Sequence, residues 1–429
     1  MDTPKSESLR LRQAILLAGQ WCAVASLFVV PINKPATNVA VFLSILFSLL
    51  GSDTRQRWLA AWHSPVARGV LAWWGVLLLS VLHAWYATGR FPATGMGTAL
   101  WAYLYPLAFA SLLYTSTWRK RAIGAFVAAM TLVLLISYGM DAGLLPQRAV
   151  VHTSPDMRNT VFKEYTQQGL DTLVLGCIAL ALAITSTVKR TRVVFVIIAV
   201  AALANVALVI QSRTAYITLI PVLLYGGYRL LSLSGWNKKQ IVLTGAAMAM
   251  AGLIIWKASP IQDRLVNAIP SEVAQYEQSH QATSTGIRLE LWQHTLSIIK
   301  TAPWFGHGYG QWIPLYEQSI GHQPNANQFM EGHPHQEMLL IASEEGVLGL
   351  AFYLFLLAAL LRYALRLALP ERDIYLCLLL IYLVAGLGNC LWADFSHRHL
   401  FILLLACIPA MQSKPQASSK STVSPELTA

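Results

Sequence analysis

Residues 193–210 read V-V-F-V-I-I-A-V-A-A-L-A-N-V-A-L-V-I, and this run decides the fold class because it contains no charged side chain. A helix needs about 20 mostly apolar residues to cross the hydrocarbon core of a bilayer. Runs of comparable length recur along the 429 residues, of which 55% are hydrophobic and 12% charged. Outer-membrane barrels show alternation over segments of about ten residues instead. The sequence therefore predicts an all-α, polytopic integral membrane protein.

The apolar runs and the charged breaks between them predict about twelve transmembrane helices. Their ranges are 11–31, 36–50, 66–86, 97–116, 121–140, 167–187, 193–211, 213–229, 240–256, 336–361, 374–392 and 398–412. The second run is short, and little sequence separates the seventh from the eighth, so eleven or thirteen spans also fit.

These ranges divide the chain into four regions. Residues 1–256 hold the first nine spans, 257–335 form a long loop, 336–412 hold the last three spans, and 413–429 form a low-complexity tail. Tails of such composition are typically disordered.

The distribution of basic residues predicts the orientation. Alternate connections, counted from the N-terminus, hold twenty of the 31 Lys and Arg residues. Because cytoplasmic loops carry an excess of basic residues, both termini are predicted to be cytoplasmic and the long loop to face the outside. The net charge of +11 then reflects topology and anionic lipid headgroups. No basic stripe with interleaved aromatic residues suggests a nucleic-acid partner.

The long loop shows two helical patterns. One covers Ser271–Gln281, and the other covers Thr285–Thr301 and stops before Pro303. The glycine-rich sequence W-F-G-H-G-Y-G follows at 304–310 and includes Tyr309. Its glycines would allow a ligand to approach the backbone closely. We expect a small helical cap on the outer surface of the membrane.

Two arginines are predicted at helix starts. Ser212 is a favourable N-cap, which makes Arg213 the first residue of the eighth span, and Thr285 as N-cap places Arg288 at the third helical position. A cation near a helix N-terminus costs about 0.3–1 kcal/mol. This unfavourable placement predicts that an anion completes the site. Arginine matches phosphate oxygens in bidentate fashion, so a diphosphate is the favoured ligand.

His335 has a related position. Pro334 suits the first position of a helix, which places His335 at the outer start of the tenth span. A helix N-terminus and nearby arginines favour the neutral imidazole, the form that a general base needs near pH 7. A purely structural loop histidine is the alternative interpretation.

A histidine-ligated metal site is another interpretation of this region. His333 and His335 are two residues apart, and His307 and His322 are near in sequence, but no H-E-x-x-H motif or carboxylate pair accompanies them. All five cysteines lie in apolar runs, so no cysteine-ligated zinc site is indicated. We expect neither a metal nor another cofactor.

The segment Ser343–Gly346 places Glu344 and Glu345 inside apolar sequence. Charged residues at such positions are functional sites by default, so a proton or ion site is one interpretation. The favoured interpretation is that Gly346 breaks the tenth span and that the two glutamates pair with loop arginines or line a polar cavity.

Four motifs together resemble a known family. They are S-R-T-A at 212–215, T-G-I-R-L-E-L-W at 285–292, P-W-F-G-H-G-Y-G at 303–310, and H-P-H-Q at 333–336 followed by L-x-x-x-S-E-E-G-V-L-G-L. They resemble the O-antigen ligases, whose superfamily also holds O-antigen polymerases and some protein O-oligosaccharyltransferases. The resemblance implies a GT-C-like glycosyltransferase of the bacterial inner membrane. Its donor would be O-antigen on undecaprenyl diphosphate, and its acceptor a sugar hydroxyl of lipid A–core oligosaccharide on the periplasmic face.

The resemblance also implies roles for single residues. The family's two essential arginines correspond to Arg213 and Arg288, and its essential histidine corresponds to His335. Gln336 stands where the family commonly has asparagine, which keeps an amide available. Further supporting residues are predicted to be Ser212, His333, Gln336, Glu344, Glu345 and Tyr309.

Two alternative functions stay open. The polymerases share the same scaffold, so the acceptor is less firmly indicated than the chemistry. A transporter of lipid-linked sugars also needs many spans and an arginine-lined cavity, but transporters often show repeated halves and charges through the membrane. Here the functional charges gather at one face, which favours an enzyme.

Overall fold

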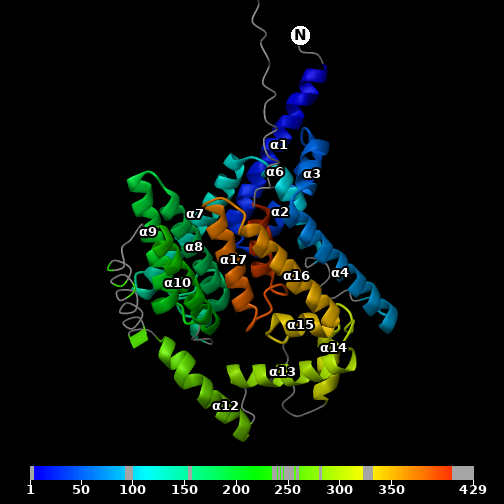
Figure 1. Cartoon of the computed structure of the whole chain (residues 1–429), viewed down its shortest axis with the longest axis vertical. Helices are drawn as coiled ribbons and strands as arrows, with labels where there is room; N and C mark the ends of the chain where they lie inside the picture. The colour runs from blue at the N-terminus through cyan, green and yellow to red at the C-terminus, as the bar shows by residue number, and fades with distance from the viewer. Residues whose placement is uncertain are drawn as a thin grey trace, which may run out of the picture.

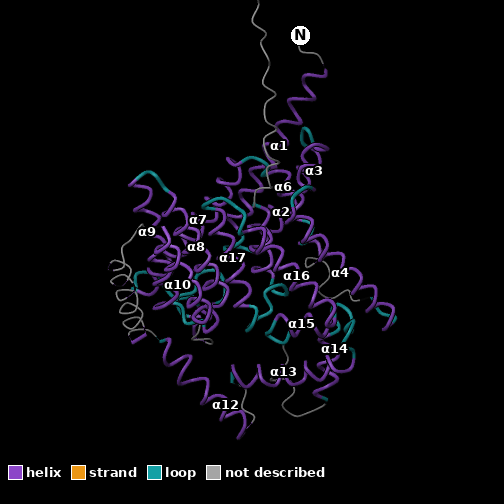
Figure 2. Tube along the Cα trace, viewed as in Figure 1, coloured by secondary structure: helices purple, strands orange, loops and turns teal. Residues whose placement is uncertain are grey.

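The computed structural model describes residues 4–91, 100–152, 157–233, 260–279, 283–321 and 332–407, together with positions 239, 242, 245, 256 and 257. Within these residues all regular secondary structure is helical (Figures 1 and 2). The predicted all-α fold class is therefore confirmed.

Seven stretches of the described chain are long and apolar enough to cross a membrane. They lie in α1 (Pro4–Val29), α4 (Pro65–Thr88), α7 (Ser116–Asp141), α8 (Tyr165–Thr185), α9 (Lys189–Ala204) with the π-helical turn Asn205–Val209, α10 (Arg213–Leu233) and α16 (Gly346–Ala364). The pair α2 (Lys34–Leu50) and α3 (Thr54–Trp62) bends by 115° and would make an eighth. The chain is a multi-pass membrane protein.

Three of the remaining predicted spans correspond to shorter helices. These are α6 (Tyr105–Leu112), α17 (Glu371–Ala385) and α18 (Phe395–Ala406). At 1.5 Å per residue, helices of 8 to 15 residues reach only about 12–22 Å, less than the ~30 Å hydrocarbon core. The predicted ninth span, 240–256, and the tail, 413–429, lie essentially outside the described residues, so the count of twelve stays a prediction.

The spanning helices pack around α8 and turn apolar side chains outward. Helix α8 lies beside α7, α9, α10 and α17 (Figure 1), and 78% of its apolar window is buried. Apolar side chains that face outward from the spanning helices α7, α10 and α16 include Leu135, Leu224 and Phe355, which are 64–69% exposed. Such an apolar exterior suits lipid and not water.

A separate layer of helices lies at one end of the membrane bundle (Figure 1). It comprises α12 (Ala268–Ser279), α13 (Ser284–Thr301) and α14 (Trp312–Ile320), which confirms both predicted loop helices to within three residues. These helices share a small apolar core of their own, in which the rings of Trp312 and Tyr316 stack at 4.8 Å. We call this layer the cap.

The tenth predicted span is broken in two. Helix α15 (Glu337–Glu344) ends where α16 begins, at Gly346 with φ 71°. The glycine-rich turn 304–310 packs its backbone directly on this break: a Cβ on Gly306 would lie 2.3 Å from the Glu344 carbonyl oxygen, and one on Gly308 would lie 2.6 Å from the Ala84 nitrogen. The break at Gly346 is confirmed. At Gly306 and Gly308, however, the close approach is to the chain itself and not to a ligand.

Candidate active site

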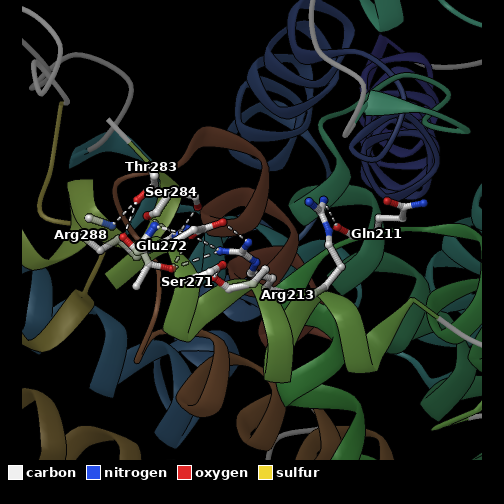
Figure 3. A network of polar contacts seen from close by, with 11 residues as sticks. Gln211, Arg213, Ser271, Glu272, Thr283, Ser284 and Arg288 are labelled. Carbon is white, nitrogen blue, oxygen red and sulfur yellow. Dashed lines mark hydrogen bonds and ion pairs between the residues drawn. The ribbon is translucent and has the colours of Figure 1, made fainter. Parts of the chain in front are cut away.

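Arg213 is the first residue of α10, as predicted, and Ser212 is its N-cap, accepting a hydrogen bond from the Ala215 nitrogen at 3.3 Å. The Arg213 guanidinium meets both carboxyl oxygens of Glu272: Nη1 donates to Oε2 at 2.8 Å and Nη2 donates to Oε1. Nη1 also reaches the Thr285 hydroxyl at 3.2 Å. An anion therefore does face Arg213, and it is a side chain of the cap (Figure 3).

Glu272 links α10 to both long cap helices. Besides Arg213, its carboxylate accepts hydrogen bonds from the Thr285 nitrogen at 3.0 Å and the Thr285 hydroxyl at 2.6 Å. Partial burial alone would raise the pKa of the Glu272 carboxyl, but the hydrogen bonds from Arg213 and Thr285 outweigh it and lower the pKa to about 2. Sequence reasoning missed Glu272, because an acidic residue near the start of a polar helix is ordinary.

Arg288 lies two residues further from the helix start than predicted. The N-cap of α13 is Thr283, whose hydroxyl accepts from the Gly286 nitrogen at 3.1 Å, so Arg288 is the fifth helical residue and not the third. The helix begins earlier because Thr283 supplies the cap and Thr285 is engaged with Glu272. Arg288 Nη1 donates to the Ser284 hydroxyl at 2.7 Å and to the Ser284 carbonyl at 3.0 Å.

The two arginines belong to one polar network. In Figure 3, Arg213 and Arg288 lie on either side of Glu272, with Ser284 next to Arg288. The connection runs from Arg213 to Thr285, whose chain neighbour Ser284 holds Arg288. Only Arg213 lies at the start of a helix, where a cation is unfavourable. The two arginines nevertheless lie in one network, as predicted.

His335 precedes helix α15 and is not part of it. The N-cap of α15 is Gln336, whose side-chain oxygen accepts from the Leu339 nitrogen, so Pro334 is not the first helical residue. The predicted position was wrong because the Gln336 amide provides a cap that starts the helix later than the proline suggested. His335 has φ 52°, in the left-handed region, which costs a non-glycine residue about 1–3 kcal/mol and must be held by its surroundings.

One local contact and one contact from the cap fix the backbone around His335. Its own nitrogen donates to His333 Nδ1 at 3.2 Å, and the two imidazole rings meet edge to face at 4.5 Å. Trp292 Nε1 donates to the Pro334 carbonyl at 3.0 Å. Trp292 follows Arg288 by four residues on α13, so both residues lie on one face of that helix. The cap helix that carries Arg288 thus also holds the His335 segment.

A second connection reaches the same segment from the membrane side. Asn389, in the chain between α17 and α18, donates from Nδ2 to the Thr214 hydroxyl at 2.7 Å, next to Arg213. The same stretch accepts a hydrogen bond at the Gly386 carbonyl from the Glu337 nitrogen, at 2.9 Å. The structure therefore gathers Arg213, Arg288 and His335 around the junction of cap and membrane bundle.

A family model described as O-antigen ligase matches residues 198–354, a range that contains both arginines and His335. The match spans little more than a third of the chain and supports membership of the O-antigen ligase/polymerase superfamily. Members of this superfamily are membrane glycosyltransferase-like enzymes that act on lipid-linked glycans and polysaccharides. A protein of Haemophilus influenzae (strain Rd), described as uncharacterized, is 29% identical over 116 residues. That match covers 26% of this chain and 29% of the Haemophilus protein.

Four of the other predicted site residues line a cavity of about 1110 Å³ beside His335, whereas Ser212 and Gln336 are not part of its lining. Its walls include His333, Tyr309, Glu344 and Glu345, whereas the lining within the described residues includes neither arginine of the network. Glu344 Oε1 accepts from the Gly310 nitrogen at 3.0 Å, and Glu345 Oε1 accepts from the Ser80 hydroxyl at 3.1 Å. The expectation that these glutamates line a polar cavity is confirmed.

The arrangement of the histidines bears on the alternative of a metal site. In the part of the chain that the structure describes, no three His, Cys, Asp or Glu side chains gather as metal ligands would. His307 instead contacts the Thr301 hydroxyl at 2.9 Å through Nε2, and His322 lies outside the described residues. Independence from metal stays a prediction.

Proposed function

We propose that this chain is an O-antigen ligase. It transfers O-antigen polysaccharide from undecaprenyl diphosphate to a sugar hydroxyl of lipid A–core oligosaccharide. Both termini are cytoplasmic in this proposal, and the loop of residues 257–335, which carries the cap, lies on the periplasmic face of the inner membrane. The family match supports the general chemistry. The arrangement of Arg213 and Arg288 around Glu272 (Figure 3), with the His335 segment held from the same cap helix by Trp292, supports the mechanism.

The observation that carries the proposal is the pair of arginines on either side of one carboxylate. The two-point contact between Arg213 and Glu272 has the geometry with which arginine also binds phosphate. In the proposal, the donor's diphosphate takes over this edge of Arg213 and engages Arg288 with its other phosphate. Negative charge grows on the diphosphate as the glycosidic bond breaks, and two fixed guanidinium groups stabilise that charge in the transition state.

His335 is the general base in this proposal. It accepts the proton of the acceptor hydroxyl while the hydroxyl oxygen bonds to the anomeric carbon and the carbon–oxygen bond to the diphosphate breaks. The products are the new glycoside, undecaprenyl diphosphate and a protonated His335, which then releases its proton to water. Because one displacement occurs, the configuration at the anomeric carbon inverts. The step needs no nucleotide sugar and no divalent metal.

A transfer assay tests the proposal. Purified protein in sealed proteoliposomes is incubated with undecaprenyl diphosphate-linked O-antigen and lipid A–core, with EDTA present, and the products are separated by gel mobility and identified by mass spectrometry. We expect a covalent adduct of O-antigen and lipid A–core. Recovery of both substrates unchanged, with donor moved across the bilayer, would instead indicate a transporter. Activity that EDTA abolishes would contradict the metal-independent mechanism.

A further inference from the structure

The cavity beside His335 has a lining suited to carbohydrate. Its walls include the aromatic side chains of Trp73, Tyr103, Tyr309 and Trp392, which come from four separate parts of the chain. Its volume of about 1110 Å³ exceeds the ~300–1,000 Å³ typical of sites for single drug-sized ligands. Flat aromatic walls with a few polar groups suit sugar rings, whose C–H faces are apolar and whose edges carry hydroxyls. The cavity can therefore hold several sugar residues.

Three carboxyl groups belong to the polar part of this lining, which also includes Arg90 and Arg398. Glu337, Glu344 and Glu345 are 3–7% exposed, and within the described residues none of them forms a salt bridge. Glu344 uses Oε1 for the Gly310 and Trp312 nitrogens, while its Oε2 makes no hydrogen bond to any described residue. A carboxylate accepts hydrogen bonds, and a protonated carboxyl both donates and accepts them. That is the pairing that a sugar hydroxyl needs.

We propose that this cavity binds the sugar residues of the acceptor, with Glu344 hydrogen-bonded to an acceptor hydroxyl. The assignment rests on the proposed transferase function. It adds a second substrate site to the arginine network, which by itself accounts only for the diphosphate of the donor.

The position of His335 favours the acceptor over the glycan of the donor. In a single displacement the attacking hydroxyl approaches the anomeric carbon from the side opposite to the leaving diphosphate. His335 is tied to the arginine network through Trp292 and touches His333, which is part of the cavity wall. The base thus lies between the network and the cavity. A hydroxyl that arrives from the cavity meets His335 on the side away from the arginines.

Blocking the cavity at its exposed edge tests the proposal with little risk to folding. Gln318 is an exposed residue of α14 in the cavity lining, and Gln293 is an exposed residue of α13 outside it. We expect Gln318→Trp to raise the KM for lipid A–core at least about tenfold, the effect of losing roughly 1.4 kcal/mol of binding, with the KM for the lipid-linked donor within about twofold of wild type. Gln293→Trp, the matched control, should leave both KM values unchanged.

The polar contact is tested by two changes at one position. Glu344→Leu should raise the KM for lipid A–core about tenfold or more, whereas Glu344→Gln, which still donates and accepts, should stay within about threefold of wild type. Glu317→Gln, on the exposed side of α14, controls for the loss of a carboxylate. Thermal unfolding of each variant checks that the fold is retained.

The possible outcomes separate this proposal from the proposed function. If wild-type protein forms no glycan–lipid A–core adduct, the transferase function itself is wrong. If wild type is active and Gln318→Trp leaves the acceptor KM unchanged, the cavity is not the acceptor site. If the donor KM rises in place of the acceptor KM, the cavity holds the glycan of the donor, and the proposal is overturned.

Discussion

Arg213 and Glu272 form a two-point ion pair that joins the first residue of a membrane helix to the cap. Both side chains are only 16–17% exposed, so solvent screens the pair less than it would a surface pair. Because the pKa of Glu272 is lowered to about 2, the stability that this pair contributes is present above the ordinary glutamate pKa of 4.5 and is lost only as the pH falls towards 2. The pair is therefore intact at neutral pH.

Replacing Glu272 should strengthen donor binding. In the proposed mechanism the carboxylate competes with the diphosphate for Arg213, and Glu272→Gln weakens the competitor while keeping an acceptor for the Thr285 hydrogen bonds. We expect the KM for the donor to fall roughly fivefold, the scale of a ~1 kcal/mol ion pair. Initial rates with lipid-linked donor measure it, and Glu277→Gln on the exposed side of α12 is the control. A higher donor KM would mean that Glu272 positions Arg213 and does not compete.

Arg288→Lys should inactivate the protein although the positive charge is kept. Lysine offers a point charge in place of a planar fork and cannot engage two phosphate oxygens in the same way. We expect kcat/KM for the lipid-linked substrate to fall by about 10²–10³. That is the effect of removing one hydrogen-bond donor that stabilises the transition state. Lys300→Ala at the exposed end of α13 should leave the rate unchanged. Wild-type activity in Arg288→Lys would rule out two-point recognition at this residue.

His335→Ala should lower kcat and leave substrate binding almost intact. Removal of a general base typically costs about 10²–10⁴ in rate. The KM values for donor and acceptor should change little, because the arginines and the cavity still bind the substrates. Single-turnover rates with both substrates saturating provide the measurement, with His63→Ala, an exposed histidine far away in the sequence, as the control. Near-normal turnover in His335→Ala would remove the base from the mechanism.

Gly346→Ala should lower the free energy of unfolding, because a Cβ at this position strains the backbone at the α15–α16 break. A Cβ at this position would lie 2.3 Å from the Trp304 carbonyl oxygen, and the residue has φ 71°. We expect a loss of roughly 2 kcal/mol or more in the free energy of unfolding, because both strain and a backbone clash arise. Gly75→Ala in α4, where a Cβ meets nothing within 4 Å, is the matched control for thermal unfolding. Equal unfolding temperatures for the two variants would contradict this account of the α15–α16 break.

Local sequence patterns predicted those features that depend on local physics. The run at 193–210 became α9 with its π-helical turn, Ser212 caps α10, and Gly346 breaks the tenth span, since apolar length, capping and positive φ are properties of a few neighbouring residues. Competing caps are harder to rank. Thr283 caps α13 while Thr285 is engaged with Glu272 of another helix, and the Gln336 amide starts α15 later than Pro334 suggested.

The partners of the site residues could not be predicted in this way. Glu272 lies 59 residues from Arg213, and the link between Trp292 and Pro334 spans 42 residues, so no periodicity or spacing indicates either contact. The glycines of the 304–310 turn illustrate the same limit. Their sequence shows that something approaches the backbone closely, but only the packing against Glu344 and Ala84 shows what it is.

The most direct test of the central claim is the identity of the acceptor. Purified protein receives labelled lipid-linked O-antigen together with equal amounts of lipid A–core and of a second, unlabelled lipid-linked O-antigen, and the label in each product is measured by mass spectrometry. The account predicts that the label appears on lipid A–core, and that Arg213→Ala and His335→Ala abolish this product. Label found only in lengthened O-antigen on undecaprenyl diphosphate would identify a polymerase and contradict the proposed ligase function.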